Sequence, residues 1–93
     1  MEKFEPNFRP TVRPDLPFRE LCDGGVVYDY HTDTLHSLNT TAAYIWALCD
    51  GNHTIADIVA SIRENFKNFE TDPDNEVHQT VEKFRTLNLL SNV

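Results

Sequence analysis

The sequence contains little of what phosphate-binding and disulfide-rich proteins need. Only 3 of its 93 residues are glycine, and two of these are adjacent, so it has no glycine-rich phosphate loop. Its 2 cysteines are too few to staple a small secreted domain. The first residues lack the apolar stretch of a signal peptide, and no run approaches the length of a membrane span. We therefore expect a cytoplasmic protein with reduced thiols and no membrane partner.

Positive charge is also scarce. Eight Lys and Arg residues stand against 15 Asp and Glu residues, which gives a net charge of -7. Proteins that bind nucleic acid need clustered cations that displace counterions from phosphates, so this balance argues against a nucleic-acid partner. A chain of 93 residues forms one small domain. Such a domain uses nearly all its apolar residues in one core and has little room for an enclosed substrate pocket.

The first 17 residues differ in composition from the rest of the chain. Pro6, Pro10, Pro14 and Pro17 recur every three or four residues, which forbids a helix and favours extended backbone. We expect a proline-rich arm over residues 1–17 and one folded domain after it, up to residue 93. The arm either drapes over its own domain or exchanges with a second copy, which would produce a homodimer.

A small antiparallel sheet is predicted after the arm. Alternating apolar and polar residues, many of them β-branched or aromatic, indicate strands near 18–22, 26–30 and 34–38. Turns are expected at the glycine-containing "CDGG" and at the polar "HTDT". The third strand contains no proline, and as an edge strand it can accept an extended peptide as an added strand. The alternative is an edge that the arm covers or that is too short to pair.

Three helices are predicted in the remainder. The first follows Asn39 as N-cap, the second begins with Thr54 and a capping box to Asp57, and the third begins at Asp72 and Pro73. Each carries apolar residues at helical spacing. The order of elements predicts an α+β fold of the winged helix–turn–helix type, with a three-stranded antiparallel sheet followed by a three-helix bundle.

Catalytic and metal sites are not indicated. Cys49 lies on the apolar face of the first helix, where a buried and inert thiol is expected. The 4 histidines and 2 cysteines would suffice in number for zinc, but none forms a CxxC or HxxxH pair, and solvated histidines explain them better. We therefore predict a protein that is not an enzyme and has no metal and no cofactor.

Three functions remain open on the residues alone. The first is a peptide-binding domain that uses the edge of the third strand. The second is a winged-helix DNA-binding regulator, although the third helix sets only Lys83 and Arg85 against Asp74, Glu76 and Glu82. The third is a structural or dimerising subunit whose sheet edge is already filled.

The stretch "VVYDYHTDTLHSLNTTAAYIWALCDGNHTIADIVASI" resembles the PqqD family, the small proteins of pyrroloquinoline quinone biosynthesis and their relatives. The resemblance is carried by the strand ending in "LN", by "TAAYIW", "LCDG" and "HTIADIV", and by the last helix ending in "LNLL". It covers roughly residues 18 to 91. It implies a non-catalytic chaperone that binds the leader of a ribosomally made precursor peptide by β-strand addition. The chaperone then presents the peptide to a modifying enzyme, often a radical S-adenosylmethionine (SAM) enzyme.

The resemblance also implies where the leader would bind, along the third strand and in a groove shared with the third helix. The residues that it marks as peptide-binding are Leu35, His36 and Ser37 on the strand, and Val77, His78, Val81, Glu82 and Arg85 on the helix. Core packing is an equally good explanation of Val77 and Val81. A surface salt bridge would also explain Arg85.

Overall fold

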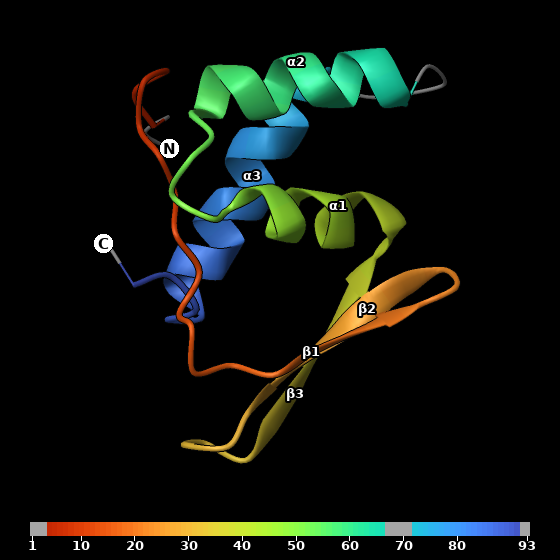
Figure 1. Cartoon of the computed structure of the whole chain (residues 1–93), viewed down its shortest axis with the longest axis vertical. Helices are drawn as coiled ribbons and strands as arrows, with labels where there is room; N and C mark the ends of the chain where they lie inside the picture. Colours follow the sequence, from red (N-terminus) through yellow and green to blue (C-terminus); the bar gives the residue numbers. More distant parts are fainter. Residues whose placement is uncertain (1–3, 67–71, 92–93) are drawn as a thin grey trace.

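The computed structural model describes residues 4–66 and 72–91. Within these residues three strands come first and three helices follow: β1 (Phe18–Leu21), β2 (Gly24–Asp29), β3 (Thr34–Asn39), α1 (Thr40–Leu48), α2 (Ile55–Asn65) and α3 (Pro73–Thr86). The strands form one antiparallel sheet in the order β1-β2-β3, and the helices lie on one side of it (Figure 1). The predicted α+β, winged helix–turn–helix-like fold is confirmed.

The helix starts follow the capping pattern that the sequence predicts. Asn39 Oδ1 accepts a hydrogen bond from the N–H of Ala42 at 2.8 Å. Thr54 and Asp57 form a reciprocal capping box, in which each side chain accepts from the other residue's backbone N–H at 3.0 Å. Asp72 caps α3 ahead of a proline in its first turn. Caps of this kind contribute about 1 kcal/mol each to stability, because they satisfy donors that have no partner within the helix.

The glycines after β1 differ from the prediction. The turn consists of Cys22 and Asp23, whereas both glycines belong to β2. A Cβ on Gly24 would lie 1.9 Å from the carbonyl oxygen of Leu38, and a Cβ on Gly25 would lie 2.5 Å from the ring of Phe18. The glycines therefore allow β2 to approach its neighbours closely, in place of forming the turn.

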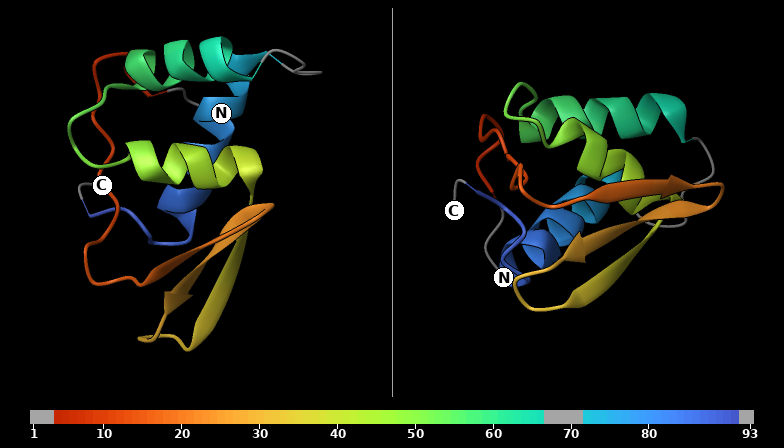
Figure 2. Two further views of the ribbon diagram at one scale, coloured as in Figure 1. Left: turned by 45° about the vertical axis from the view of Figure 1, so that its right-hand side comes forward. Right: turned by 60° about the horizontal axis from the view of Figure 1, so that its bottom comes forward.

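The core lies among the three helices and continues between α1 and the sheet. Figure 2 shows α2 on the side of the molecule away from the sheet. The predicted helical stripes supply most of the core: Ile45, Trp46 and Cys49, then Ile55, Ile58, Val59 and Ile62, then Val77, Val81 and Phe84. The sheet contributes Val27 and Leu38. The ring of Phe84 packs edge-on against Trp46 with centroids 5.3 Å apart, so α3 is anchored directly on α1.

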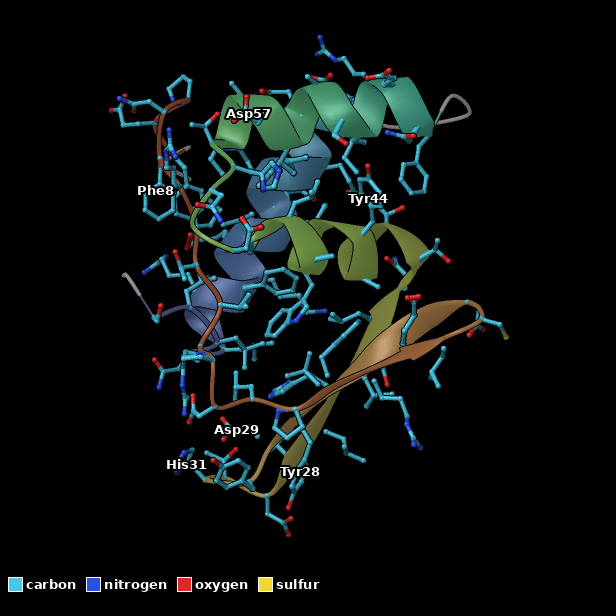
Figure 3. The ribbon with its side chains drawn as sticks, in the orientation of Figure 1. Phe8, Tyr28, Asp29, His31, Tyr44 and Asp57 are labelled. Carbon is cyan, nitrogen blue, oxygen red and sulfur yellow. The ribbon has the colours of Figure 1, made fainter. Side chains whose placement is uncertain are left out.

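The described part of the arm lies on its own domain. The carbonyl oxygens of Phe8 and Pro6 accept hydrogen bonds from the N–H groups of Ile55 and Ala56, at 2.8 and 3.0 Å. These two donors belong to the first turn of α2 and have no partner within that helix. Figure 3 shows Phe8 beside this end of α2, which also carries Asp57. The arm therefore completes the cap of α2. Residues 1–3 of the predicted arm lie outside the described residues.

The arm also holds the turn between β2 and β3. Asp15 accepts hydrogen bonds from the guanidinium of Arg13 and from the ring of His31, each at 2.9 Å. These bonds, from Arg13 first and then from His31, lower the pKa of Asp15 to about 2. Arg13 also donates to the carbonyl oxygen of Asn88 at 3.0 Å. Arg13 and Asp15 thus join the hairpin, the arm and the end of α3.

Candidate functional site

The direction of the backbone groups in the sheet follows from one hydrogen bond. Tyr28 donates its N–H to the carbonyl oxygen of Pro17 at 3.0 Å, so the backbone of Tyr28 points toward the β1 side. In antiparallel sheets, successive residues direct these groups to opposite neighbours. The backbone N–H and C=O of Val27 therefore point toward β3, where the partner of Val27 in the register is His36. The backbone N–H and C=O of His36 consequently point back at β2.

The residues on either side of His36 have the opposite orientation. Leu35 and Ser37 direct their backbone N–H and C=O groups away from β2, toward the outer edge of β3. No strand in the described part of the chain pairs with this edge. The arm makes its isolated bridges with other segments, Thr11 with Asp50 and Val12 with Leu90. The edge of β3 thus offers unpaired donors and acceptors to a further strand.

A groove lies between the end of β3 and α3. On the strand side it is lined by Ser37, Leu38 and Asn39, and on the α3 side by Glu76, Thr80, Lys83 and Phe84. Ala42 of α1 and Leu21, Asp23 and Gly25 complete the lining. We call this feature the β3 groove. It combines an open strand edge with a mixed apolar and charged surface beside it, which is the arrangement that proteins use to bind extended peptides.

The helical residues predicted to bind peptide lie elsewhere on α3. Val77 and Val81 have exposed fractions of 0 %, so both belong to the core, which was the competing explanation. Phe84 comes from the same stripe and also lines the groove. His78 is buried against the arm, where its Nδ1 accepts a hydrogen bond from the N–H of Phe4 at 3.1 Å. Direct contact of Val77, Val81 or His78 with a peptide stays a prediction.

Glu82 and Arg85 form a surface ion pair. Arg85 Nε donates to Glu82 Oε2 at 2.8 Å, and a second bond joins the other nitrogen and oxygen. This hydrogen bonding lowers the pKa of Glu82 and raises the pKa of Arg85. Neither residue lines the β3 groove. The salt bridge offered as an alternative explanation of Arg85 is present, and contact of Arg85 with a peptide stays a prediction.

The charged residues of the groove are ones that the sequence pattern did not single out for binding. Glu76, Thr80 and Lys83 follow one another at helical spacing beside the buried stripe of α3. Glu76 and Lys83 are seven residues apart, which is about 10 Å along a helix. Lys83 is exposed and makes no ion pair with any other described residue. The sequence feature that could have identified these groove residues is the row of polar residues next to the apolar stripe of α3. Such a row marks the helix face at the border of the core.

Both cysteines are free thiols, of which Cys22 is exposed and Cys49 is buried. Cys49 is fully buried, and burial raises the pKa of its thiol to about 12, which removes the nucleophilic thiolate at neutral pH. No three His, Cys, Asp or Glu side chains among these residues come together to hold a metal ion. None of the described helices is long and apolar enough to cross a membrane.

Comparison with known proteins gives one family and two similar structures. The model of the coenzyme PQQ synthesis protein D family (PqqD) matches residues 24–90. The structure of TbiB1 in complex with the TbiA(beta) leader peptide has a TM-score of 0.76 at 16% identity, and the match covers 89% of this chain and 96% of that one. Lasso peptide synthetase B1 complexed with the leader peptide also gives 0.76, at 20% identity, covering 90% and 99%. No curated protein matches the sequence. At these identities the two structures establish a shared fold.

Proposed function

Because the chain belongs to the PqqD family, whose model matches residues 24–90, we propose that it binds the leader of a ribosomally made precursor peptide. The leader adds as a strand to β3 and places its side chains in the β3 groove. The protein then presents the peptide to a radical SAM enzyme or another modifying enzyme, and takes no part in the chemistry itself.

The observation that carries this proposal is the open edge of β3 beside a groove. Leu35 and Ser37 offer backbone donors and acceptors there, and a strand that pairs with them gains affinity independent of its sequence. Alternate side chains of an added strand point to opposite faces. One set therefore enters the groove beside Thr80 and Lys83, and the other lies next to Leu35, whose side chain is 67% exposed.

The comparisons support the same function. Both similar structures are complexes with a leader peptide, and the matches span nearly the whole of each of those chains. They give no support to a DNA-binding regulator. The charge of the chain argues in the same direction, because the net charge is -7 and Arg85 on α3 is already paired with Glu82.

The groove also indicates which leaders fit. Lys83 is a cation on the groove wall with no partner among the described residues, so it favours an acidic side chain in the leader. Arg85 is less suited to this role, because its guanidinium is already bonded to Glu82. We therefore assign the charge recognition to Lys83.

The partner enzyme and the oligomeric state extend the proposal further. The family match supports delivery to a modifying enzyme, for which a radical SAM enzyme is one candidate class. A homodimer through the arm requires Phe8 and Pro6 to cap α2 of a second copy with the same two hydrogen bonds that they make to their own α2.

The test uses the precursor peptide and the modifying enzyme encoded beside this gene. Precursor modification is followed by mass spectrometry with and without the protein, for the full precursor and for its core without the leader. We expect the protein to accelerate modification of the full precursor only. A rate that is the same with and without the protein, together with no binding of the leader in calorimetry, contradicts the proposal.

A further inference from the structure

Among the described residues the sheet has a second open edge, at β1, which is the opposite edge of the sheet from β3. Leu21 at the end of β1 also lines the β3 groove. The carbonyl of Pro17 points at β2, since it accepts from Tyr28. By the same alternation the backbone N–H and C=O of Arg19 point at β2, whereas those of Phe18 and Glu20 point outward. Among the described residues, no strand other than β2 pairs with β1. β1 therefore offers a strand partner the same kind of edge as β3 does.

A groove lies beside this edge as well, between β1 and α1. Small side chains of α1, Ala43 and Ala47, line it together with the aromatic rings of Phe18, Tyr44 and Phe66. Tyr44 packs edge-on against Phe66 with centroids 5.2 Å apart, and its hydroxyl is 2.5 Å from the hydroxyl of Ser61 (Figure 3 shows Tyr44 on α1). These contacts hold one aromatic side of the groove in place. We call it the β1 groove.

The charges on β1 decide which occupant fits. Glu20 is the one charged side chain that lines this groove within the described residues, and it is exposed and has no ion-pair partner there. A second copy of the chain fits poorly. When two β1 strands pair antiparallel, outward-facing residues must lie opposite outward-facing residues, so the two-fold axis passes through Arg19 or through Glu20. Either arrangement places a residue opposite the same residue of the other copy, and like charges in directly opposed positions are destabilising. A strand with a cation opposite Glu20 avoids that penalty.

The spacing of Phe18 and Glu20 then determines the order and spacing of two residues in the occupant. Both side chains lie on the face of the sheet that borders the groove, two positions apart. An antiparallel strand passes Glu20 first and Phe18 second. We propose that the β1 groove binds an extended segment of a partner protein that carries a basic residue and, two positions later, an apolar residue. The protein then holds one added strand at each edge of its sheet, a leader at β3 and a segment of its partner at β1.

Two synthetic ten-residue peptides test this proposal directly. Both are threonine-rich; one has Lys-Thr-Val at its centre and the other has Glu-Thr-Val. Each is titrated into the isotope-labelled full chain and followed by amide NMR. We expect the lysine peptide to shift the amides of Phe18, Glu20 and Ala47, and to bind about fivefold tighter than the glutamate peptide, as expected when a cross-strand attraction replaces a repulsion.

Three variants separate the outcomes. Glu20→Lys should reverse the order of the two peptides, whereas Glu64→Lys, an exposed change on α2 that does not line this groove, should leave it unchanged. Ala47→Trp fills the groove and should abolish the shifts at Phe18 and Glu20. Equal binding of both peptides to the original protein, or shifts confined to Leu35 and Ser37, overturns the proposal. Leader binding at β3 is measured separately, so its outcome is independent of this one.

Discussion

Replacement of one residue of β3 by proline can test peptide binding at the outer edge of the strand without weakening its pairing with β2. Ser37 directs its N–H away from β2, so Ser37→Pro removes a donor that no other strand in the described part of the chain uses. At His36 the same change would remove a donor that points at β2 and would weaken the sheet itself. The two neighbouring positions therefore give opposite expectations for stability and for peptide binding.

The size of the effect follows from the hydrogen bond that is lost. One backbone hydrogen bond contributes about 1 kcal/mol net, and the leader carbonyl that loses its donor costs about another 1 kcal/mol. A loss of about 2 kcal/mol weakens leader binding about thirtyfold. The cost to folding is smaller than at His36, because only strain at the fixed φ of proline opposes the change at Ser37.

Fluorescence anisotropy with a labelled leader measures the affinity, and urea unfolding measures the stability of each variant. Ser37→Ala is the matched control, since it keeps the N–H and should bind as the original protein does. A Ser37→Pro protein that folds and binds the leader with unchanged affinity refutes strand addition at β3. A loss of affinity in Ser37→Ala as large as in the proline variant would show that the hydroxyl is what matters.

Three further changes test the groove, the core and the arm. Lys83→Glu should weaken binding of an acidic leader about tenfold, whereas Arg85→Glu should change it less than twofold, because Arg85 is already paired with Glu82; calorimetry compares the two. Phe84→Ala should cost about 3 to 5 kcal/mol in urea unfolding, because the ring is 1% exposed, and Phe84→Leu should cost less. Asp15→Asn should destabilise the fold at neutral pH. The pKa of Asp15 falls to about 2 on folding from an unfolded value of about 3.9, so its stabilisation is complete above about pH 5 and is lost as the pH drops toward about 2. Urea unfolding across that range should show the two proteins converge at low pH.

Each of these three has a contradicting result. Equal loss of leader affinity in both charge variants would remove the special role of Lys83. A Phe84→Ala protein of nearly unchanged stability would mean that α3 does not rest on Trp46. A stability difference between the original and Asp15→Asn that persists at pH 2 would show that the ionised carboxylate is not its source.

The order of elements and the helix starts could be predicted from sequence because their signals are local. Asn39, the Thr54–Asp57 box and the Asp72–Pro73 pair each act within one turn of backbone. The glycine pair after β1 belongs to β2 and not to the predicted turn, because its role is a close approach across the sheet. Gly24 faces Leu38, fourteen residues away, and no local pattern reveals such a contact.

The surface that we propose for leader binding could be predicted from the sequence only in part. The third strand was identified as an edge from the order of strands and its lack of proline, and the structure places Leu35 and Ser37 there. On α3 the apolar stripe with Val77 and Val81 was a natural candidate for binding, yet the same residues are needed for the core of a small domain. Which polar row borders the groove depends on how α3 is rotated over the sheet, and tertiary packing alone fixes that rotation.

The account rests on leader binding at β3, and amide NMR of the full chain titrated with the leader tests it most directly. The leader is the one encoded beside this gene, and a scrambled version of it serves as the control. The account predicts shifts in Thr34–Asn39 and around Thr80 and Lys83, with little change at Phe18 and Glu20 of β1. Specific binding of the leader whose shifts leave β3 and α3 untouched would contradict it.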